Sequence, residues 1–358
     1  MSLTRRALSH TALAAAALAA MPAAAQPGKP KSKPRPIVIA HRGASGERPE
    51  HTMMGYRLAI EEGCDFIEPD LVVTKDGHLV VRHENEISGT TDVAAHPEFA
   101  DRKTTKTVDG TTINGWFVED FTLAELKTLR ARERLPKLRP GSAAFDGKEP
   151  IPTFQEVVDL AKAETKRTGR TIGVYPEMKH PTYLAMAGLP IERRLAEALK
   201  DNWLNTPTAP VFVQCFEVSP LKTFRMLSGA RLIQLVYSES GPADRAGTLY
   251  VDMIKPDGLK EIAAYADGIG PEWSQILPTG ADGGLAAPTS LVDDAHAAGL
   301  MVHPWTVRAE NYFLPPKLRR GASQADHGDV EAVYKALYAA GVDGLFSDFP
   351  ALAVAARG

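Results

Sequence analysis

Two histidines and two carboxylates lie close to short apolar runs in the first half of this chain. His41 ends one such run, before a stretch of glycine and small residues, and His83 closely follows another. The break after His41 predicts that it lies at the C-terminal tip of a strand, where α/β folds place their chemistry. Imidazoles titrate near neutral pH and can serve as general acid and base. With Glu68 and Asp70, they predict a site for phosphodiester cleavage.

A β-hairpin is expected to bring these groups together. A turn signal at residues 74–77 separates two apolar runs. A turn centred near Asp76 puts Glu68 and His83 approximately opposite each other, and Asp70 falls on the same face because strand side chains alternate. A shift of one residue in the turn register would move His83 to the opposite face.

A third carboxylate follows a later β-rich run. Glu177 lies two residues after this run, and alternation puts Lys179 on the same face. Glu68, Asp70 and Glu177 together could hold one hard divalent cation, with Ca²⁺ as the first choice and Mg²⁺ as the alternative. Each carboxylate alone is more typical of a surface charge or a helix cap. Their joint placement at strand tips favours a metal site.

Eight β-rich runs alternate with helical patterns from residue 37 onward. The alternation predicts an α/β fold, a (β/α)8 TIM barrel. The expected strands are residues 37–40, 66–73, 172–175, 211–214, 232–236, 268–270, 301–305 and 344–346, and the expected helices are residues 52–62, 153–166, 191–202, 220–227, 259–266, 289–298 and 330–340. Residues 87–150, rich in Thr, Lys, Gly and Pro, interrupt this pattern. They are expected to form an insertion after the second barrel strand and its hairpin, beside the barrel mouth.

The N-terminus has the pattern of an export signal. Residues 1–25 combine paired arginines, an apolar stretch too short to span a bilayer and a final Ala-x-Ala sequence. The arginines fit the twin-arginine route and also an ordinary secretory signal. Residues 26–36, rich in Lys and Pro, predict a solvated linker, and residues 37–358 form the expected barrel domain. We therefore expect a periplasmic protein, with release outside the cell as the alternative.

The composition of the chain bears on whether it binds nucleic acid or a membrane. Lys+Arg number 41 and Asp+Glu 44, for a formal net charge of -3, and no basic cluster is interleaved with aromatic residues. Nucleic acid is therefore not an expected partner. No long apolar segment follows the signal, so the mature chain is expected to be soluble, without a stable membrane anchor. Cys64 and Cys215 are expected to be buried thiols. Their pairing and the oligomeric state are left open.

The order of the motifs resembles the glycerophosphodiester phosphodiesterase family, especially its periplasmic bacterial members. The resemblance covers nearly all of the expected mature chain. Its motifs are His41-Arg42-Gly43-Ala44-Ser45, Pro49-Glu50-His51-Thr52, Glu68-Pro69-Asp70, Thr74-Lys75-Asp76-Gly77, His83, Tyr175-Pro176-Glu177-Met178-Lys179, Gln214-Cys215-Phe216 and the segments 266–271, 302–308 and 344–350. Two positions depart from the family pattern. Glu84 replaces a frequent Asp after the second histidine, and Glu47-Arg48 replaces a more apolar pair, which leaves the head-group preference open.

The resemblance implies a role for each motif residue. His41 and His83 would act as general acid and base, in an order left open. The metal ligands would be Glu68, Asp70 and Glu177, and the phosphate contacts would be Arg42 and Lys179. The implied reaction is metal-dependent hydrolysis of glycerophosphodiesters to sn-glycerol 3-phosphate and an alcohol, through a cyclic phosphate or by direct attack of water.

Two other functions would require different features of the chain. A phospholipase D-like activity on lysophospholipids would need an apolar channel for an acyl chain, and the predicted insertion has no long hydrophobic face. A protein that binds phosphodiesters without hydrolysing them would not need two proton-transfer groups, so the paired histidines argue against it.

Several residues carry weaker predictions. Gln214 is a candidate substrate contact or a structural hydrogen-bonding group. Trp305 is a candidate for packing against the glycerol or head group, or a core aromatic. Glu50 would orient Arg42 or a histidine, or begin a helix. His303 is expected to be structural.

Overall fold

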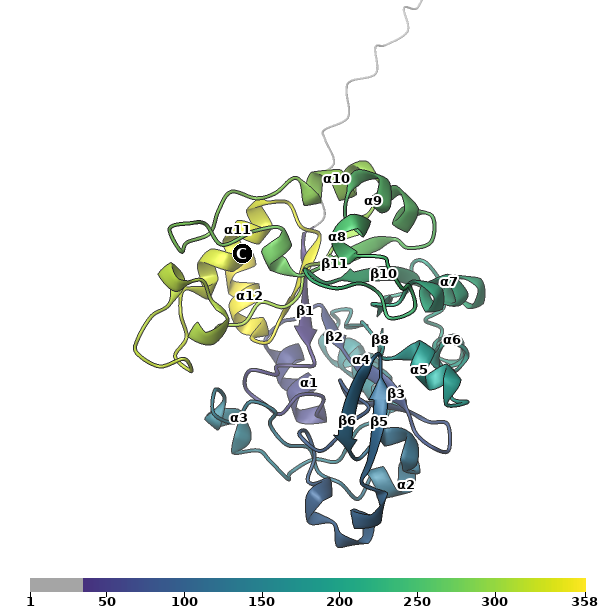
Figure 1. Cartoon of the computed structure of the whole chain (residues 1–358). Helices are drawn as coiled ribbons and strands as arrows, with labels where there is room; N and C mark the ends of the chain where they lie inside the picture. Colours follow the sequence, from purple (N-terminus) through teal and green to yellow (C-terminus); the bar gives the residue numbers. More distant parts are fainter. Residues whose placement is uncertain (1–34) are drawn as a thin grey trace, which may run out of the picture. The chain divides into compact units, whose positions relative to one another are not determined.

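The computed structural model describes residues 35–358, so the predicted signal and most of the predicted linker lie outside the described residues. Two hydrogen-bonded sheets contain the barrel strands, in the orders β13-β1-β2-β7 and β12-β11-β10-β9-β8-β3-β4 (Figure 1). The barrel strands are β1 (Ile37–His41), β2 (Phe66–Glu68), β3 (Asp70–Val73), β7 (Gly173–Val174), β8 (Glu177–Met178), β9 (Phe212–Cys215), β10 (Arg231–Val236), β11 (Gly268–Pro271), β12 (Met301–Val302) and β13 (Gly344–Ser347). Neighbouring barrel strands are parallel, and the predicted TIM barrel is confirmed.

Two predicted strands are each divided into two short ones. Pro69 has no N–H to donate, and it separates β2 from β3; Pro176 likewise falls between β7 and β8. Backbone hydrogen bonds from Asp343 to Val302 (3.0 Å) and from Phe346 to Pro304 (2.9 Å) join the last two strands and complete the ring.

Both faces of the barrel strands are buried, as expected for a parallel sheet covered by helices. In β1, Ile39 packs inside the barrel against aromatic residues such as Tyr175 and Phe346. Its neighbours Val38 and Ala40 belong to the layer between strands and helices. This explains why the strand reads as a continuous apolar run.

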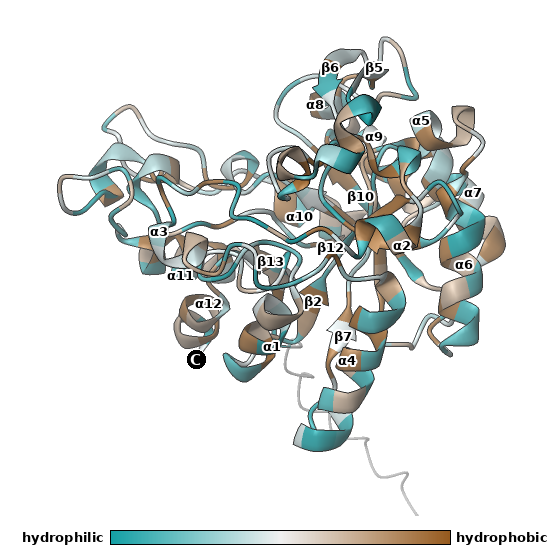
Figure 2. Ribbon diagram, turned by 90° about the horizontal axis from the view of Figure 1, so that it is seen from below, coloured by the Kyte–Doolittle hydropathy of each residue, from teal (hydrophilic) through white to brown (hydrophobic). Residues whose placement is uncertain are grey.

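Helices cover the outside of the barrel. Their bounds are α1 (Met53–Glu61), α4 (Phe154–Thr168), α5 (Pro181–Met186), α6 (Ile191–Asp201), α7 (Val218–Leu227), α8 (Tyr250–Met253), α9 (Pro256–Ala263), α10 (Leu291–Ala297), α11 (Val330–Ala339) and α12 (Pro350–Arg357). A capping box between Thr153 and Glu156 begins α4, and Gly169 in the left-handed region (φ 69°) ends it. Its inner face is hydrophobic and its outer face hydrophilic (Figure 2). The seven predicted helices form, and α5, α8 and α12 were not predicted.

Residues 87–150 contain elements outside the barrel alternation. These are 3-10 turns η1 (Val93–Ala95), η2 (Pro97–Arg102) and η3 (Val118–Asp120), the hairpin of β5 (Thr104–Val108) and β6 (Thr111–Gly115), and helices α2 (Leu123–Leu126) and α3 (Pro140–Ala143). Their buried side chains form a separate apolar cluster with Val72 and Val80 of the β3–β4 hairpin. The segment therefore packs on one barrel hairpin, and its identity as an insertion stays a prediction.

That hairpin is centred on Asp76, as predicted, and its register differs by one residue from an exact pairing of Glu68 with His83. In the antiparallel pair of β3 and β4 (Leu79–Val81), Leu71 lies opposite Val81. Continued along the chain, this register places Pro69, not Glu68, opposite His83. The paired strand ends at Val81, so the pleat no longer fixes the direction of His83, and its side chain still lines the cavity described below.

Two further expectations concern the described residues. Cys64 and Cys215 are buried and unpaired, which confirms the buried-thiol prediction. Between residues 35 and 358, no helix has both the length and the hydropathy needed to cross a membrane.

Candidate active site

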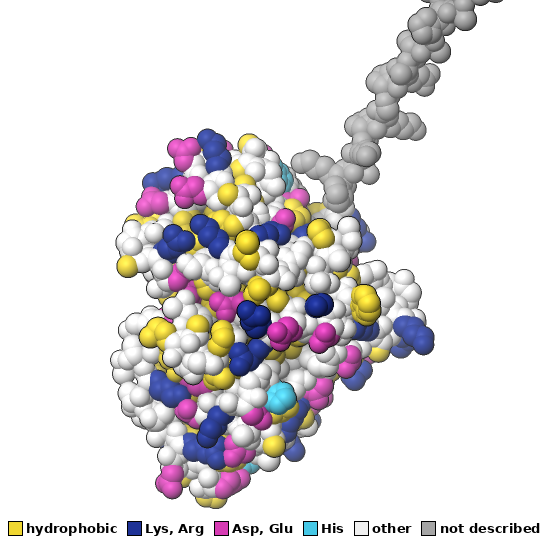
Figure 3. All heavy atoms as spheres, turned by 90° about the vertical axis from the view of Figure 1, so that its right-hand side faces the viewer, with side chains coloured by type: hydrophobic (Ala, Val, Ile, Leu, Met, Phe, Trp, Pro, Cys, Tyr) yellow, Lys and Arg dark blue, Asp and Glu magenta, His cyan; other side chains and the backbone are white. Residues whose placement is uncertain are grey.

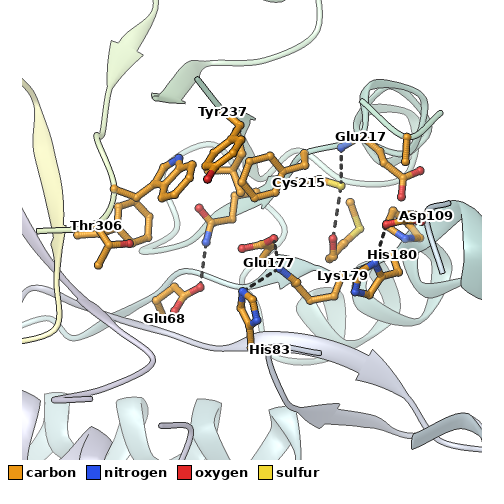
Figure 4. A pocket seen from close by; sticks show the side chains of 18 of the residues that line it. Glu68, His83, Asp109, Glu177, Lys179, His180, Cys215, Glu217, Tyr237 and Thr306 are labelled. Carbon is orange, nitrogen blue, oxygen red and sulfur yellow. Dashed lines mark hydrogen bonds and ion pairs between the residues drawn. The ribbon is translucent and has the colours of Figure 1, made fainter. Parts of the chain in front are cut away.

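The largest group of predicted site residues meets in one cavity of about 500 Å³ at the C-terminal ends of the barrel strands (Figure 4). Its lining includes His41, Arg42, Glu68, His83, Glu177, Lys179, Gln214 and Trp305. Asp70 and Glu50 are buried beside this lining. Enzymes with this fold place their chemistry at the same end of the barrel.

Strand register brings the three predicted metal ligands together. Glu68 ends β2 in register with His41 of β1, and Asp70 begins β3 in register with Glu177 of β8. One carboxylate oxygen from each of Glu68, Asp70 and Glu177 lies within 4.8 Å of the others. All three residues are buried.

Neighbouring donors hold each carboxylate in place. Gln214 donates to Glu68 Oε1 (3.0 Å), and the backbone N–H of Arg42 donates to Glu68 Oε2 (2.8 Å). Arg42 has a φ of 60°, a left-handed conformation uncommon for a residue with a side chain, which accompanies this contact. His51 Nε2 lies 2.9 Å from Asp70 Oδ2, and Lys179 donates to Glu177 (2.9 Å).

The carboxylate cluster has the charge and donor set that a divalent cation requires. Burial and the nearby charges of Asp70 and Glu177 raise the pKa of Glu68 well above its usual value. Burial also raises the pKa of Glu177 to about 8, against the opposing effect of Lys179. Asp70 Oδ1 is buried without a hydrogen-bond partner among the described residues. A hard cation such as Ca²⁺ or Mg²⁺ fits these oxygens and would relieve their repulsion.

His41 is oriented by a carboxylate from the other end of the chain. Its Nδ1 donates to Asp348 Oδ1 over 2.6 Å, although the two residues are 307 positions apart. This bond leaves Nε2 of the imidazole for proton transfer at the cavity. Burial and the Arg42 charge lower the pKa of His41 to about 3, against the opposing effect of Asp348. The imidazole is therefore neutral at pH 7.

His83 lies on the other side of the carboxylate cluster. Its Nε2 accepts a hydrogen bond from Lys179 over 3.3 Å, and its Nδ1 lies 2.7 Å from Glu84 Oε1. Burial, with the charges of Arg42 and Lys179, lowers the pKa of His83 to about 3. Both imidazoles therefore line the same cavity as Arg42 and Lys179.

Comparison with known proteins assigns the chain to a family. The sequence model of the "Glycerophosphoryl diester phosphodiesterase family" matches residues 41–352. The chain belongs to this family. It is 37% identical to glycerophosphodiester phosphodiesterase GDPD6 of Arabidopsis thaliana over 336 residues, covering 90% of this chain and 86% of the relative. It is 33% identical to the glycerophosphodiester phosphodiesterase of Haemophilus influenzae, covering 88% and 87%. The protein is therefore a glycerophosphodiester phosphodiesterase.

Solved structures confirm the fold of this phosphodiesterase. A putative glycerophosphoryl diester phosphodiesterase from Silicibacter pomeroyi superimposes with a TM-score of 0.63 at 20% identity, covering 90% of this chain and 94% of the other. An Oleispira antarctica phosphodiesterase, solved with its product sn-glycerol-3-phosphate, has a TM-score of 0.57 at 22% identity, covering 90% and 96%. At these identities, the likeness establishes the fold alone.

Several residues of this phosphodiesterase site were not singled out from the sequence. Asp348, directly after the last barrel strand, bonds to His41 and also accepts from Arg308 (2.9 Å) and Arg139 (2.5 Å). His51, which was given no role from the sequence, holds Asp70. The Pro49-Glu50-His51-Thr52 motif, which precedes the first helix, was a sequence feature that could have identified His51 as a site residue. For Arg139, in the predicted insertion, no local signal exists.

The weaker predictions also have definite positions in the phosphodiesterase. Glu50 accepts from Arg42 Nη1 at 2.9 Å, so it orients the predicted phosphate contact. Trp305 lines the cavity, and its indole N–H donates to Gly270 O at 2.8 Å. His303 lies among the barrel aromatics and its Nδ1 is 2.9 Å from the Tyr175 hydroxyl, as expected for a structural residue.

Proposed function

We propose that this protein is an exported, metal-dependent hydrolase of the periplasmic type, which cleaves glycerophosphodiesters to sn-glycerol 3-phosphate and an alcohol. The observation that carries the proposal is the convergence of two neutral imidazoles, two cationic side chains and three buried carboxylates on one cavity. A phosphodiester has one anionic phosphate between two alcohol arms, and this arrangement is complementary to it.

In the proposed reaction, Arg42 and Lys179 hold the phosphate. Both side chains are buried, so their interaction with an anion is weakly screened. As charge develops on the phosphoryl oxygens, these fixed cations stabilise it more than they stabilise the ground state. Glu50 keeps the Arg42 guanidinium in position through the 2.9 Å ion pair.

His41 and His83 carry the proton transfers. One neutral imidazole accepts the proton of the attacking oxygen. The other takes up a proton when the anionic phosphodiester binds, because a nearby anion raises the pKa of an imidazole, and it then donates this proton to the departing alcohol. Asp348 keeps His41 Nδ1 engaged, so that exchange occurs at Nε2. Glu84 Oε1 lies 2.7 Å from His83 Nδ1 as an ion-pair contact, without the geometry of a hydrogen bond.

Glu68, Asp70 and Glu177 are the proposed ligands of one divalent cation, with Ca²⁺ first and Mg²⁺ second. The cation would act as a Lewis acid on a phosphoryl oxygen. Gln214, as the donor to Glu68, fixes one carboxylate before the cation binds. The oppositely charged side chains visible on the face in Figure 3 are interspersed, which suits a small-molecule substrate better than a polyanion.

The proposal is tested by release of sn-glycerol 3-phosphate from glycerophosphocholine. Turnover is expected to disappear in EDTA and to return with Ca²⁺ or Mg²⁺. Lysophosphatidylcholine is assayed in parallel as the lysophospholipase D-type substrate. Turnover of lysolipid alone would replace the proposal by that activity. Binding of glycerophosphocholine without turnover under any metal condition would replace it by a binding function.

A further inference from the structure

The two sides of the active-site cavity differ in chemistry. His180, Asp109 and Glu217 lie on one side of Lys179, and Tyr237 and Thr306 lie towards the other (Figure 4). His180 contacts Asp109 (2.6 Å) and Glu84 (3.2 Å). Burial opposes protonation of His180, but these carboxylates raise its pKa to about 9. This side is therefore rich in groups that hydrogen-bond to hydroxyls.

The opposite side is built from aromatic rings. The rings of Tyr237 and Trp305 stack, with centroids 5.6 Å apart and an interplanar angle of 9°. Phe216 meets Trp305 edge-on, with centroids 5.7 Å apart at 83°. The indole N–H of Trp305 is bonded to a backbone carbonyl, and Tyr237 keeps 39% of its surface exposed. Such fixed rings offer an electron-rich, apolar surface to a ligand.

A carboxylate lies beside this aromatic pair. Glu272 follows β11, and its backbone bridges to that of Trp305. Its side chain caps the 3-10 turn η4 (Trp273–Gln275), while Oε2 is buried without a hydrogen-bond partner among residues 35–358. Burial and the charges of Glu272 and Glu239 raise the pKa of Tyr237. The charge of Arg308 opposes this rise, so two carboxylates and one guanidinium act on the rings.

A second cavity continues from the first at this side. Its volume is about 320 Å³, and Trp305, Thr306 and Arg308 line both cavities. Glu272 is among the residues that line the second cavity, together with Trp305. Arg308, the nearest cation on this side, is bonded to Asp348 at 2.9 Å and packs over Phe313. Its charge is therefore partly neutralised by Asp348.

These observations give the two arms of the substrate different places. With the phosphate held at Arg42 and Lys179, the glycerol arm has two hydroxyls and suits the side of His180. A quaternary ammonium has no N–H to donate, so it forms no hydrogen bond on that side, where the carboxylates are already bonded to His180 and Thr182. It is attracted to aromatic faces and to a nearby carboxylate. Thr306 Oγ1 lies 3.5 Å from His41 Nε2, which puts the aromatic side next to His41.

We propose that Tyr237, Trp305 and Glu272 form a subsite for a quaternary ammonium head group of the choline type. The subsite rests on the proposed phosphodiesterase function and adds a preference to it. The enzyme selects a cationic, methylated head group over a neutral one of the same shape, because only the cation interacts with the ring quadrupoles and the Glu272 charge.

A pair of substrates tests this preference. Glycerophosphocholine is compared with its neutral carbon isostere, the glycerophosphodiester of 3,3-dimethylbutanol, as a ratio of kcat/KM values. The wild-type kcat/KM for glycerophosphocholine is expected to be about ten times that for the neutral isostere. This factor corresponds to the free energy of a partly desolvated cation–π contact. Glu272→Gln, which keeps the side-chain shape, and Tyr237→Leu are each expected to move the ratio towards one. Glu261→Gln, on the exposed surface of α9, is the charge-matched control and keeps the wild-type ratio.

Each outcome bears on the subsite separately from the reaction. A wild-type ratio near one, or a ratio unchanged by both variants, would overturn the subsite while leaving the hydrolysis intact. If neither diester is cleaved, the proposed hydrolysis fails, and the subsite is judged by calorimetric titration with choline chloride. Weaker choline binding by Glu272→Gln than by Glu261→Gln would then support it, and equal binding would refute it.

Discussion

Arg139 links the predicted insertion to the catalytic side of the barrel, and its replacement by methionine has a calculable cost. Its guanidinium contacts Glu310 Oε1 and Asp348 Oδ2, both at 2.5 Å, and donates to the Ser45 carbonyl at 2.9 Å. The side chains of Arg139, Glu310 and Asp348 are 5%, 0% and 2% exposed. Removing one partner of a buried ion pair leaves the other charge unpaired and costs about 3–5 kcal/mol. Arg139→Met is expected to lower the free energy of unfolding by that amount.

The matched control is Arg102→Met in the same segment. Arg102 also binds a carboxylate, Glu125, at 2.5 Å, but the two side chains are 33% and 29% exposed. A pair so exposed contributes about 0–1 kcal/mol. Urea unfolding followed by circular dichroism measures both variants, and adding Glu310→Gln to Arg139→Met should recover part of the loss by removing a stranded charge. Equal losses in the two arginine variants would refute the reasoning, and so would a double variant no more stable than Arg139→Met.

Three further predictions follow from the site and its surroundings. His83→Ala is expected to lower kcat by at least about 100-fold with an unchanged circular dichroism spectrum, because a proton-transfer group is lost; near-wild-type turnover would exclude His83 from catalysis. Glu68→Gln is expected to weaken Ca²⁺ binding in calorimetry by more than about tenfold, because one of three charged ligands is neutralised; unchanged affinity would remove Glu68 from the metal site. Burial and the Glu47 charge raise the pKa of Glu62 to about 7. The folded state therefore binds the Glu62 proton more tightly than the unfolded state does. As a result, the free energy of unfolding falls as the pH rises from about 4.5 through 7. Glu62→Gln is therefore expected to raise Tm at pH 8 and to leave it nearly unchanged at pH 4, and an equal shift at both pH values would contradict the assignment.

Different measurements distinguish the loss of the metal, of a proton-transfer group and of the head-group subsite. Loss of the metal acts on all glycerophosphodiesters, whereas the Glu272 substitution changes only the ranking of head groups. Loss of Asp348 would act through His41, because its carboxylate is bonded to the imidazole. Asp348→Asn therefore keeps the shape of the contact while removing the charge, and distinguishes orientation of His41 from electrostatic support.

Much of the barrel could be predicted because its signals are local. A few consecutive residues are enough to predict the apolar runs, the Thr153 cap and the left-handed Gly169, because each depends only on the backbone and its immediate neighbours. The grouping of Glu68 and Asp70 was also predictable, because alternation along one strand direction fixes their common side. Strands β2 and β3 were read as one, since the interruption at Pro69 leaves the hydrophobic pattern intact.

The sequence by itself determined the element order, the strand-tip motifs and the residue types of the site. Only the tertiary structure decided which distant groups touch them. The bond from His41 to Asp348 and the ion pairs of Arg139 arise because a closed barrel brings its first and last strands side by side, a consequence of ring closure with no local signal. The direction of the His83 side chain was likewise not determined by the sequence, because His83 lies beyond the paired strand and a shift of one residue in register reverses the side on which a strand residue lies.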